Sequence, residues 1–158
     1  MVATGSQGVH ILGWDDIYRA EWTPLVRQGY LMLLDREAAE DAVQTVFIKA
    51  TRRPADSIDN PAAYLRRAVT NECRSVGRRR QMVLRRTAAL GPVEATPPEE
   101  LVEFADVLAQ LSLRQRVAVV MRVLHGSTDS EIAAALGCRP GTARSLVSRG
   151  LARLREVL

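Results

Sequence analysis

The stretch "GCRPGTARSLVSRG", residues 137–150, carries the clearest structural signal in the chain. Gly137 suits a left-handed turn, and Pro140 has the backbone angle that the first position of a helix needs. Apolar residues then recur at three- and four-residue steps and can pack inward, while arginines and serines fall on another side. The inward positions are Ala143, Val147, Leu151 and Leu154, and the polar side holds Arg144, Ser145, Ser148 and Arg149.

The residues just before this stretch predict a second short helix over 129–136. Ile132 and Leu136 are apolar where two short helices must pack, and Ala133 is small at their closest approach. Together the two segments predict a helix-turn-helix, whose second helix can enter the major groove of DNA. Arginine can bind a guanine edge through two hydrogen bonds or grip phosphate. An ordinary helical hairpin is the alternative that this segment alone leaves open.

The rest of the chain also has helical spacing, and no stretch alternates as a strand does. We expect a kink or break at Pro24, helix N-caps at Asp35 and Asn60, a helix start at Pro61 and a stop at Pro54. The predicted helices cover 14–34, 36–52, 61 to past 74, 101–111, 113–124, 129–136 and 140 to the end, with a further helical stretch after Gly77 to about Leu90.

Composition divides the chain into two helical parts. Residues 91–100, "GPVEATPPEE", hold three prolines and little that is apolar, which predicts a flexible linker. The sequence therefore predicts an all-α protein with a disordered N-terminus (1–13), a first helical domain (14–90), the linker, and a second helical domain (101–158). Each domain is too small to be very stable alone.

Arginines gather in two clusters. Eight lie between positions 66 and 86 against one acid, Glu72, and eight lie between 114 and 155 against Asp129 and Glu131. Two such clusters predict two surfaces for a polyanion, and solvated helix faces are the alternative. In the first cluster, polar residues recur at helical spacing opposite Tyr64, Leu65, Ala68 and Val69, a pattern that suits contacts with a nucleic-acid backbone and bases. These polar residues are Arg67, Asn71, Arg74 and Arg78.

Other functional classes lack support in the sequence. No Ser/His/Asp set, Cys/His set or carboxylate pair converges, so we expect no enzyme, no cofactor and no metal site. His125 is expected to be a polar turn residue, and Cys73 and Cys138 to be buried free thiols. No apolar run reaches the length of a membrane span and no secretory signal is visible, so a cytoplasmic protein is expected.

These segments together resemble the extracytoplasmic-function (ECF) sigma factors of bacterial RNA polymerase, over residues 14–158. "AEDAVQTVFIKA" (39–50) resembles the helix that docks on the polymerase clamp coiled coil. "PAAYLRRAVTNECRSVGRRR" (61–80) resembles the segment that melts and reads the −10 promoter element. Residues 108–158 resemble the −35-binding domain over its full length. The two predicted domains would then be the sigma region 2 helical bundle and the sigma region 4 helix-turn-helix.

The resemblance also implies partners and site residues. The partners are promoter DNA and core RNA polymerase, through its clamp coiled coil and flap, with an anti-sigma factor left open; the free chain is expected to be a monomer. Polymerase contacts are implied for Asp41, Gln44, Phe47 and Lys49; −10 contacts for Asp56, Asn60, Arg67, Asn71, Arg74, Arg78 and Arg79; and −35 contacts for Arg139, Thr142, Arg144, Ser145, Ser148 and Arg149. Leu146 is expected to contact a thymine methyl or to pack inward.

A conventional helix-turn-helix repressor or activator is the alternative function. Such a protein acts without polymerase binding and needs a dimerisation surface that places two recognition helices one DNA turn apart. The sequence shows no long zipper and no extra dimerisation helix. The leading interpretation is therefore a subunit that gives polymerase its promoter specificity.

Overall fold

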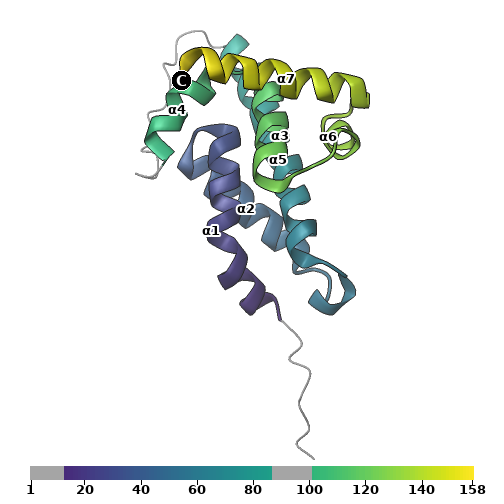
Figure 1. The fold of residues 1–158 in the computed structure, drawn as a ribbon. Coiled ribbons are helices and arrows are strands. Elements are labelled where there is room, and N and C mark those ends of the chain that lie inside the picture. The colour runs from purple at the N-terminus through teal and green to yellow at the C-terminus, as the bar shows by residue number, and fades with distance from the viewer. Residues whose placement is uncertain (1–12, 87–100) are drawn as a thin grey trace, which may run out of the picture.

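A computed structural model describes residues 13–86 and 101–158, and within these ranges the chain is helical throughout, with short connections (Figure 1). The all-α fold class is confirmed. The predicted tail (apart from Gly13), the predicted linker and the end of the helical stretch at 87–90 lie outside the described residues. The elements are α1 (Trp14–Leu33), α2 (Arg36–Ala50), a 3-10 turn (Ala55–Ser57), α3 (Pro61–Arg86), α4 (Val102–Ala109), α5 (Leu113–His125), α6 (Asp129–Leu136) and α7 (Pro140–Val157).

Helices α1, α2 and α3 form one bundle, and the predicted caps set where two of them begin. The Ala38 backbone N–H donates to the Asp35 carboxylate at 3.1 Å, and the Ala63 backbone N–H donates to the Asn60 side chain at 3.1 Å. Each cap satisfies a donor that has no partner inside its own helix. Both predicted N-caps are confirmed. Helix α2 ends at Ala50, before Pro54.

Two helices continue where the sequence suggested interruption. Helix α1 runs unbroken through Pro24, whose ring lies at the surface while the following Leu25 is buried. Helix α3 runs unbroken through Gly77, which is buried against α5. A Cβ atom at Gly77 would lie 2.5 Å from a methyl carbon of Leu113, so the missing side chain lets the two helices come close. The close contact with α5 thus outweighs the helix-breaking tendency of Gly77.

The second half is built around α5. Helix α7 crosses α5 so closely that a Cβ atom at Gly150 would lie 2.5 Å from a Val119 methyl carbon. Gly137 ends α6 at a φ of 63°, the left-handed conformation that the sequence predicted. Pro140 then occupies the first position of α7, as expected. These contacts fix the angle between α6 and α7, and therefore the side of α7 that faces outward.

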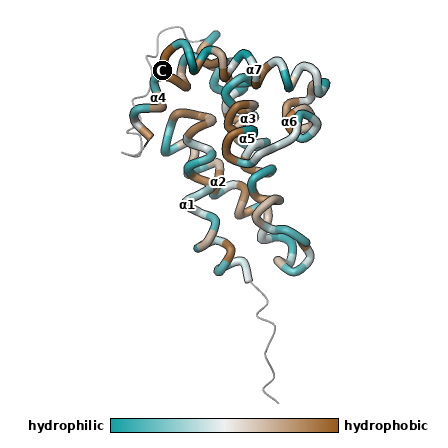
Figure 2. Tube along the Cα trace, viewed as in Figure 1, coloured by the Kyte–Doolittle hydropathy of each residue, from teal (hydrophilic) through white to brown (hydrophobic). Residues whose placement is uncertain are grey.

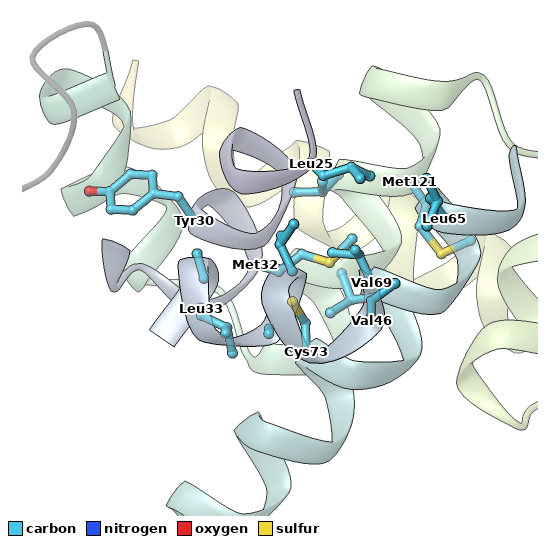
Figure 3. Close-up of a cluster of buried hydrophobic side chains, with 14 of the residues drawn as sticks. Leu25, Tyr30, Met32, Leu33, Val46, Leu65, Val69, Cys73 and Met121 are labelled. Carbon is cyan, nitrogen blue, oxygen red and sulfur yellow. The ribbon is translucent and has the colours of Figure 1, made fainter. Parts of the chain in front are cut away.

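The two halves pack against each other and share one apolar core. Buried residues of α1, α2 and α3 form a single cluster with those of α5, α6 and α7. Figure 3 shows Met121 of α5 beside Leu65 of α3, and Figure 2 shows α5 hydrophobic along much of its length in the middle of the molecule. A second, smaller cluster joins Leu31 and Leu34 to Leu108 and Leu111. The shared core compensates for the small size of each half.

Arg116 of α5 links the two halves through a partly buried guanidinium group. Its Nε donates to the Met32 carbonyl at 2.7 Å, and its Nη1 donates to the Leu108 and Leu111 carbonyls, each at 3.3 Å. Burial lowers the pKa of Arg116 from its ordinary value. Met32 lies in the last turn of α1, Leu108 in the last turn of α4 and Leu111 just beyond it. Backbone carbonyls at a helix C-terminus carry partial negative charge, which suits a guanidinium donor.

Asp35 joins α2 to the far end of α3. Besides capping α2, its carboxylate pairs with the Arg80 guanidinium, and the residue is only 7% exposed. Burial alone raises the pKa of Asp35, but the hydrogen bonds from the Ala38 N–H and from Arg80 outweigh burial and hold the pKa below its ordinary value. The charged carboxylate is therefore the form that stabilises the fold.

We expect Asp35→Ala to lower the free energy of unfolding by about 1–2 kcal/mol, because α2 loses its cap and Arg80 its partner. Asp35→Asn keeps a capping oxygen and should lose less than about 1 kcal/mol. Urea unfolding measures both.

Since the folded-state pKa of Asp35 is lowered, the charged carboxylate contributes its stability above pH 3.8, and this contribution is lost as the pH falls through the folded-state pKa. An equally steep acid loss in Asp35→Asn would contradict this assignment.

Candidate nucleic-acid interface

Helix α7 presents one polar side to solvent. Ala143 and Val147 are buried, and Leu151 and Leu154 are half-buried and pack on the core clusters, so the predicted inward stripe is confirmed. Gly150 is buried as well. Leu146 is half-buried and packs on the core, so the packing alternative holds in this structure. The predicted −35-contacting residues are all exposed: Arg139, Thr142, Arg144, Ser145, Ser148 and Arg149. The side of α7 that would enter a groove therefore consists of arginines and hydroxyl groups.

One of these arginines is tied to the preceding helix. The Arg144 Nε donates to Asp129 Oδ2 at 3.0 Å, and Asp129 Oδ1 pairs with Arg122 of α5. Hydrogen bonds from Arg144 and then Arg122 hold the pKa of Asp129 below its ordinary value. In the sequence, Asp129 counts only as an acid within the basic cluster. Its position at the start of α6, next to a predicted helix-turn-helix, was the available signal for this role.

Helix α3 brings the predicted −10 stripe to the boundary between the halves. Arg67, Asn71 and Arg78 are exposed. Arg74 is half-buried, and its guanidinium donates to the Ala135 carbonyl and, at 3.1 Å, to the Leu136 carbonyl. These carbonyls end α6, so Arg74 occupies a helix C-terminus of the second half as Arg116 occupies one of the first. In this arrangement Arg74 faces protein.

A cleft of about 510 Å³ lies between α3 and the α5–α6 corner. His125, expected to be a polar turn residue, is instead the last residue of α5 and lines this cleft. Burial, and then the neighbouring Arg66 charge, lower its pKa from the ordinary value, so the imidazole is neutral at physiological pH. The polar residues that line the cleft are Arg66, Arg67, Thr70, Asn71, His125, Ser127, Ser130 and Glu131. Two predicted −10 residues thus lie in a cleft that the second half partly covers.

The loop before α3 is exposed and held at its base. Asp56 and Asn60 both lie at the surface, and Asn60 uses its side-chain oxygen as the α3 cap. The Trp14 indole N–H donates to the Arg53 carbonyl at 2.8 Å and thereby ties α1 to the start of the loop. Periodicity in the sequence assigns Trp14 only to the apolar face of α1. The loop is therefore anchored at both ends.

Helix α2 presents three of its four predicted polymerase-contacting residues. Asp41, Gln44 and Lys49 are exposed, whereas Phe47 is 5% exposed and packs against the Tyr18 ring at 4.9 Å between centroids. Phe47 therefore belongs to the apolar core beneath α2. The exposed apolar residue on this helix is its neighbour Ile48, at 59% exposure, which the sequence pattern did not single out.

Glu72 links the predicted polymerase-contacting and −10 sets. It lies 3.6 Å from the Lys49 ammonium and 3.7 Å from the Arg79 guanidinium. Lys49 comes from α2 and Arg79 from the −10 segment of α3. One carboxylate thus holds a member of each set.

In the part of the chain that the structure describes, no three His, Cys, Asp or Glu side chains come together as metal ligands, and no helix is long and apolar enough to cross a membrane. Cys73 is buried as expected, and burial, followed by the Glu72 charge, raises its pKa to about 12. Cys138 was also expected to be buried, but it is half-buried and lies in the turn between α6 and α7.

Both halves of the chain match known protein families, and named relatives match it over most of its length. Residues 17–82 match the family described as sigma-70 region 2, and residues 101–154 match sigma-70 region 4. The chain is 31% identical to the RNA polymerase sigma-E factor of Streptomyces coelicolor, over 94% of this chain and 87% of that protein. It is 30% identical to the ECF RNA polymerase sigma factor SigM of Mycobacterium tuberculosis, over 94% and 81%.

A solved structure has a similar fold. The sigma factor RpoE of Bartonella quintana, crystallised in complex with the anti-sigma factor NepR, superposes with a TM-score of 0.71 at 28% identity, over 90% of this chain and 94% of that one. The likeness therefore extends across both halves.

We expect the double substitution Arg74→Met and Arg116→Met to separate the two halves, because Arg74 satisfies two carbonyls at the end of α6 and Arg116 satisfies one near the end of α1. Small-angle X-ray scattering should show a radius of gyration several ångströms above that of the parent, for which a compact chain of this length gives about 15 Å. Arg114→Met, at an exposed position of α5, is the matched control. An unchanged radius in the double variant, with helicity retained, would show that the apolar core alone holds the halves together.

Proposed function

Because this chain belongs to the extracytoplasmic-function family of RNA polymerase sigma factors, we propose that it binds core RNA polymerase through α2 and directs the enzyme to a promoter. In this proposal α7 reads the −35 element in the major groove. Helix α3 and the loop before it hold the melted −10 strand. The chain supplies binding and positioning, and polymerase supplies the chemistry of RNA synthesis.

The observation that carries the residue assignments is the outward side of α7. Buried small and apolar residues fix one side of that helix against α5 and α6, and the opposite side displays arginine and serine side chains. Arginine and serine are groups that donate hydrogen bonds to base edges and phosphates. A recognition helix needs this combination of rigid support and exposed donors.

The exposed loop and α3 support the −10 assignment. Opening a duplex requires capture of unstacked bases while basic groups hold the strand. Arg67 and Arg78 are exposed and form no ion pair with other described residues, which leaves their charges available to phosphates. Asn71 lies between them on the same side of α3 and offers a hydrogen-bonding amide.

Promoter binding in this scheme requires the two halves to separate. The −10 and −35 elements are about 25 base pairs apart, which is roughly 85 Å of duplex at 3.4 Å per base pair. The hydrogen bond of 3.1 Å between Arg74 and the Leu136 carbonyl instead holds the −10 helix against the helix-turn-helix. Polymerase and DNA would therefore replace the contacts between the halves with contacts of their own.

A protein partner that favours the closed arrangement fits the same scheme. The Bartonella relative was crystallised in complex with an anti-sigma factor, and its sigma chain superposes on both halves of this one. We therefore include in the proposal an anti-sigma factor that binds this chain while its halves are packed together. Such a partner would keep Arg74 engaged with α6 and away from DNA.

The clamp-facing role of α2 can be tested by gel filtration with core polymerase. The parent chain should co-elute with the core enzyme at one-to-one stoichiometry, and the double substitution Asp41→Ala and Gln44→Ala should weaken this complex roughly tenfold or more, as central interface residues do. Glu37→Ala, at an exposed position in the first turn of the same helix, is the matched control. A chain that ignores polymerase but binds palindromic DNA would support the conventional repressor or activator instead.

The recognition role of α7 can be tested by transcription in vitro. Arg144→Ala and Arg149→Ala should each lower promoter-specific initiation roughly tenfold while polymerase binding is unchanged, because each removes a base or phosphate contact. Arg153→Ala provides the control, since Arg153 is an exposed arginine of α7 outside the predicted −35 set. Normal initiation by both variants would show that α7 does not read the promoter.

A further inference from the structure

The Asp129 carboxylate lies between arginines from two other helices. Its Oδ2 accepts the Arg144 Nε hydrogen bond from α7, and its Oδ1 pairs with Nη2 of Arg122 from α5. Arg122 is itself held, because its Nε donates to the Ser127 carbonyl at 2.8 Å. One carboxylate at the start of α6 therefore connects α5, the turn and the predicted recognition helix.

Exposure shows which arginine faces outward. The Arg144 side chain is 78% exposed, against 36% for Arg122 and 22% for Asp129. Arg122 thus lies behind the carboxylate, and Arg144 extends beyond it into solvent. The lowered pKa of Asp129 keeps the carboxylate ionised at neutral pH, so the contact persists under physiological conditions.

The hydrogen-bonding pattern leaves the far edge of the Arg144 guanidinium available. A guanidinium has five N–H donors in one plane, and the bond to Asp129 uses the single donor on Nε. Donors on both Nη atoms remain, and a guanine edge offers the O6 and N7 acceptors that such a pair can bind. A long side chain already held in one orientation also loses less freedom on binding.

We propose that Asp129 is a positioning residue for promoter recognition, which orients Arg144 toward a guanine in the −35 element. This inference rests on the function proposed above and adds a residue that contacts protein only. Asp129 gives Arg144 its direction, and Arg144 makes the base contact. A carboxylate close to DNA also repels phosphate, so Asp129 disfavours binding in which Arg144 makes no specific contact.

The proposal predicts opposite changes in specific and non-specific binding. With Asp129→Asn, the preference for the base pair that Arg144 reads should fall from roughly tenfold or more to about threefold or less. Affinity for unrelated duplex DNA should be equal or higher, because one negative charge is removed. Loss of stability alone would lower both affinities together and would leave their ratio unchanged.

The experiment uses the holoenzyme formed by the full chain with core polymerase. A promoter is first mapped by sequencing the 5′ ends of RNAs that appear on overexpression, and binding is then measured on every single-base variant of its −35 element. Arg144→Ala identifies the base pair that Arg144 reads. Asp129→Asn is compared with the parent at that base pair, and again in the Arg144→Ala background, where it should have no further effect on discrimination.

Two control variants separate orientation from folding. Arg122→Gln removes the other partner of Asp129 and leaves the Arg144 contact in place, so most of the discrimination should be retained. Arg144→Lys keeps the positive charge without the planar fork, so it should lose discrimination to a similar extent as Asp129→Asn; it serves as the decisive variant if Asp129→Asn lowers the melting temperature of the chain.

The outcomes are distinguishable. A parent chain that forms no holoenzyme overturns the proposed function and this inference with it. A functional holoenzyme overturns the inference alone if Asp129→Asn, or Arg144→Lys in its place, discriminates as the parent does. The inference is also overturned if Asp129→Asn reduces discrimination equally in the Arg144→Ala background.

Discussion

A partly buried guanidinium group lies where the two halves of the chain meet, and their arrangement depends on how it is satisfied. Removing a charge from water is costly unless hydrogen bonds compensate for the lost hydration. Arg116 finds its acceptors in carbonyls of the last turns of α1 and α4 and in the Leu111 carbonyl just beyond α4. The contact therefore satisfies the charge where α1 meets α5, and α3 meets α6 along the same boundary between the halves.

Features set by local chemistry were predictable from the sequence. Asp35 and Asn60 cap helices because a short polar side chain can reach the backbone N–H groups of the first turn, and Gly137 ends α6 because it tolerates positive φ. The continuity of α3 through Gly77 was not predictable in this way. It depends on Leu113, a residue of another helix whose side chain fills the space that a Cβ atom would take.

The candidate site also contains both kinds of feature: some that local sequence predicts and some that depend on how the helices pack. Helical periodicity predicts which side of α7 is exposed, because one stripe must pack inward. The burial of Phe47 and the engagement of Arg74 with α6 depend on how helices pack, and no local pattern encodes that. The pair of Asp129 and Arg144, 15 residues apart, joins two helices across a turn and becomes visible only when their crossing angle is known.

The thiol of Cys73 has a consequence for following motions of this chain. It is 0% exposed within the bundle of α1, α2 and α3, close to Met32 and Val46 (Figure 3), and its pKa of about 12 keeps it protonated. Alkylating reagents would reach such a thiol only when the packing around it loosens. Its labelling rate therefore reports the opening of the shared apolar core to which Cys73 belongs.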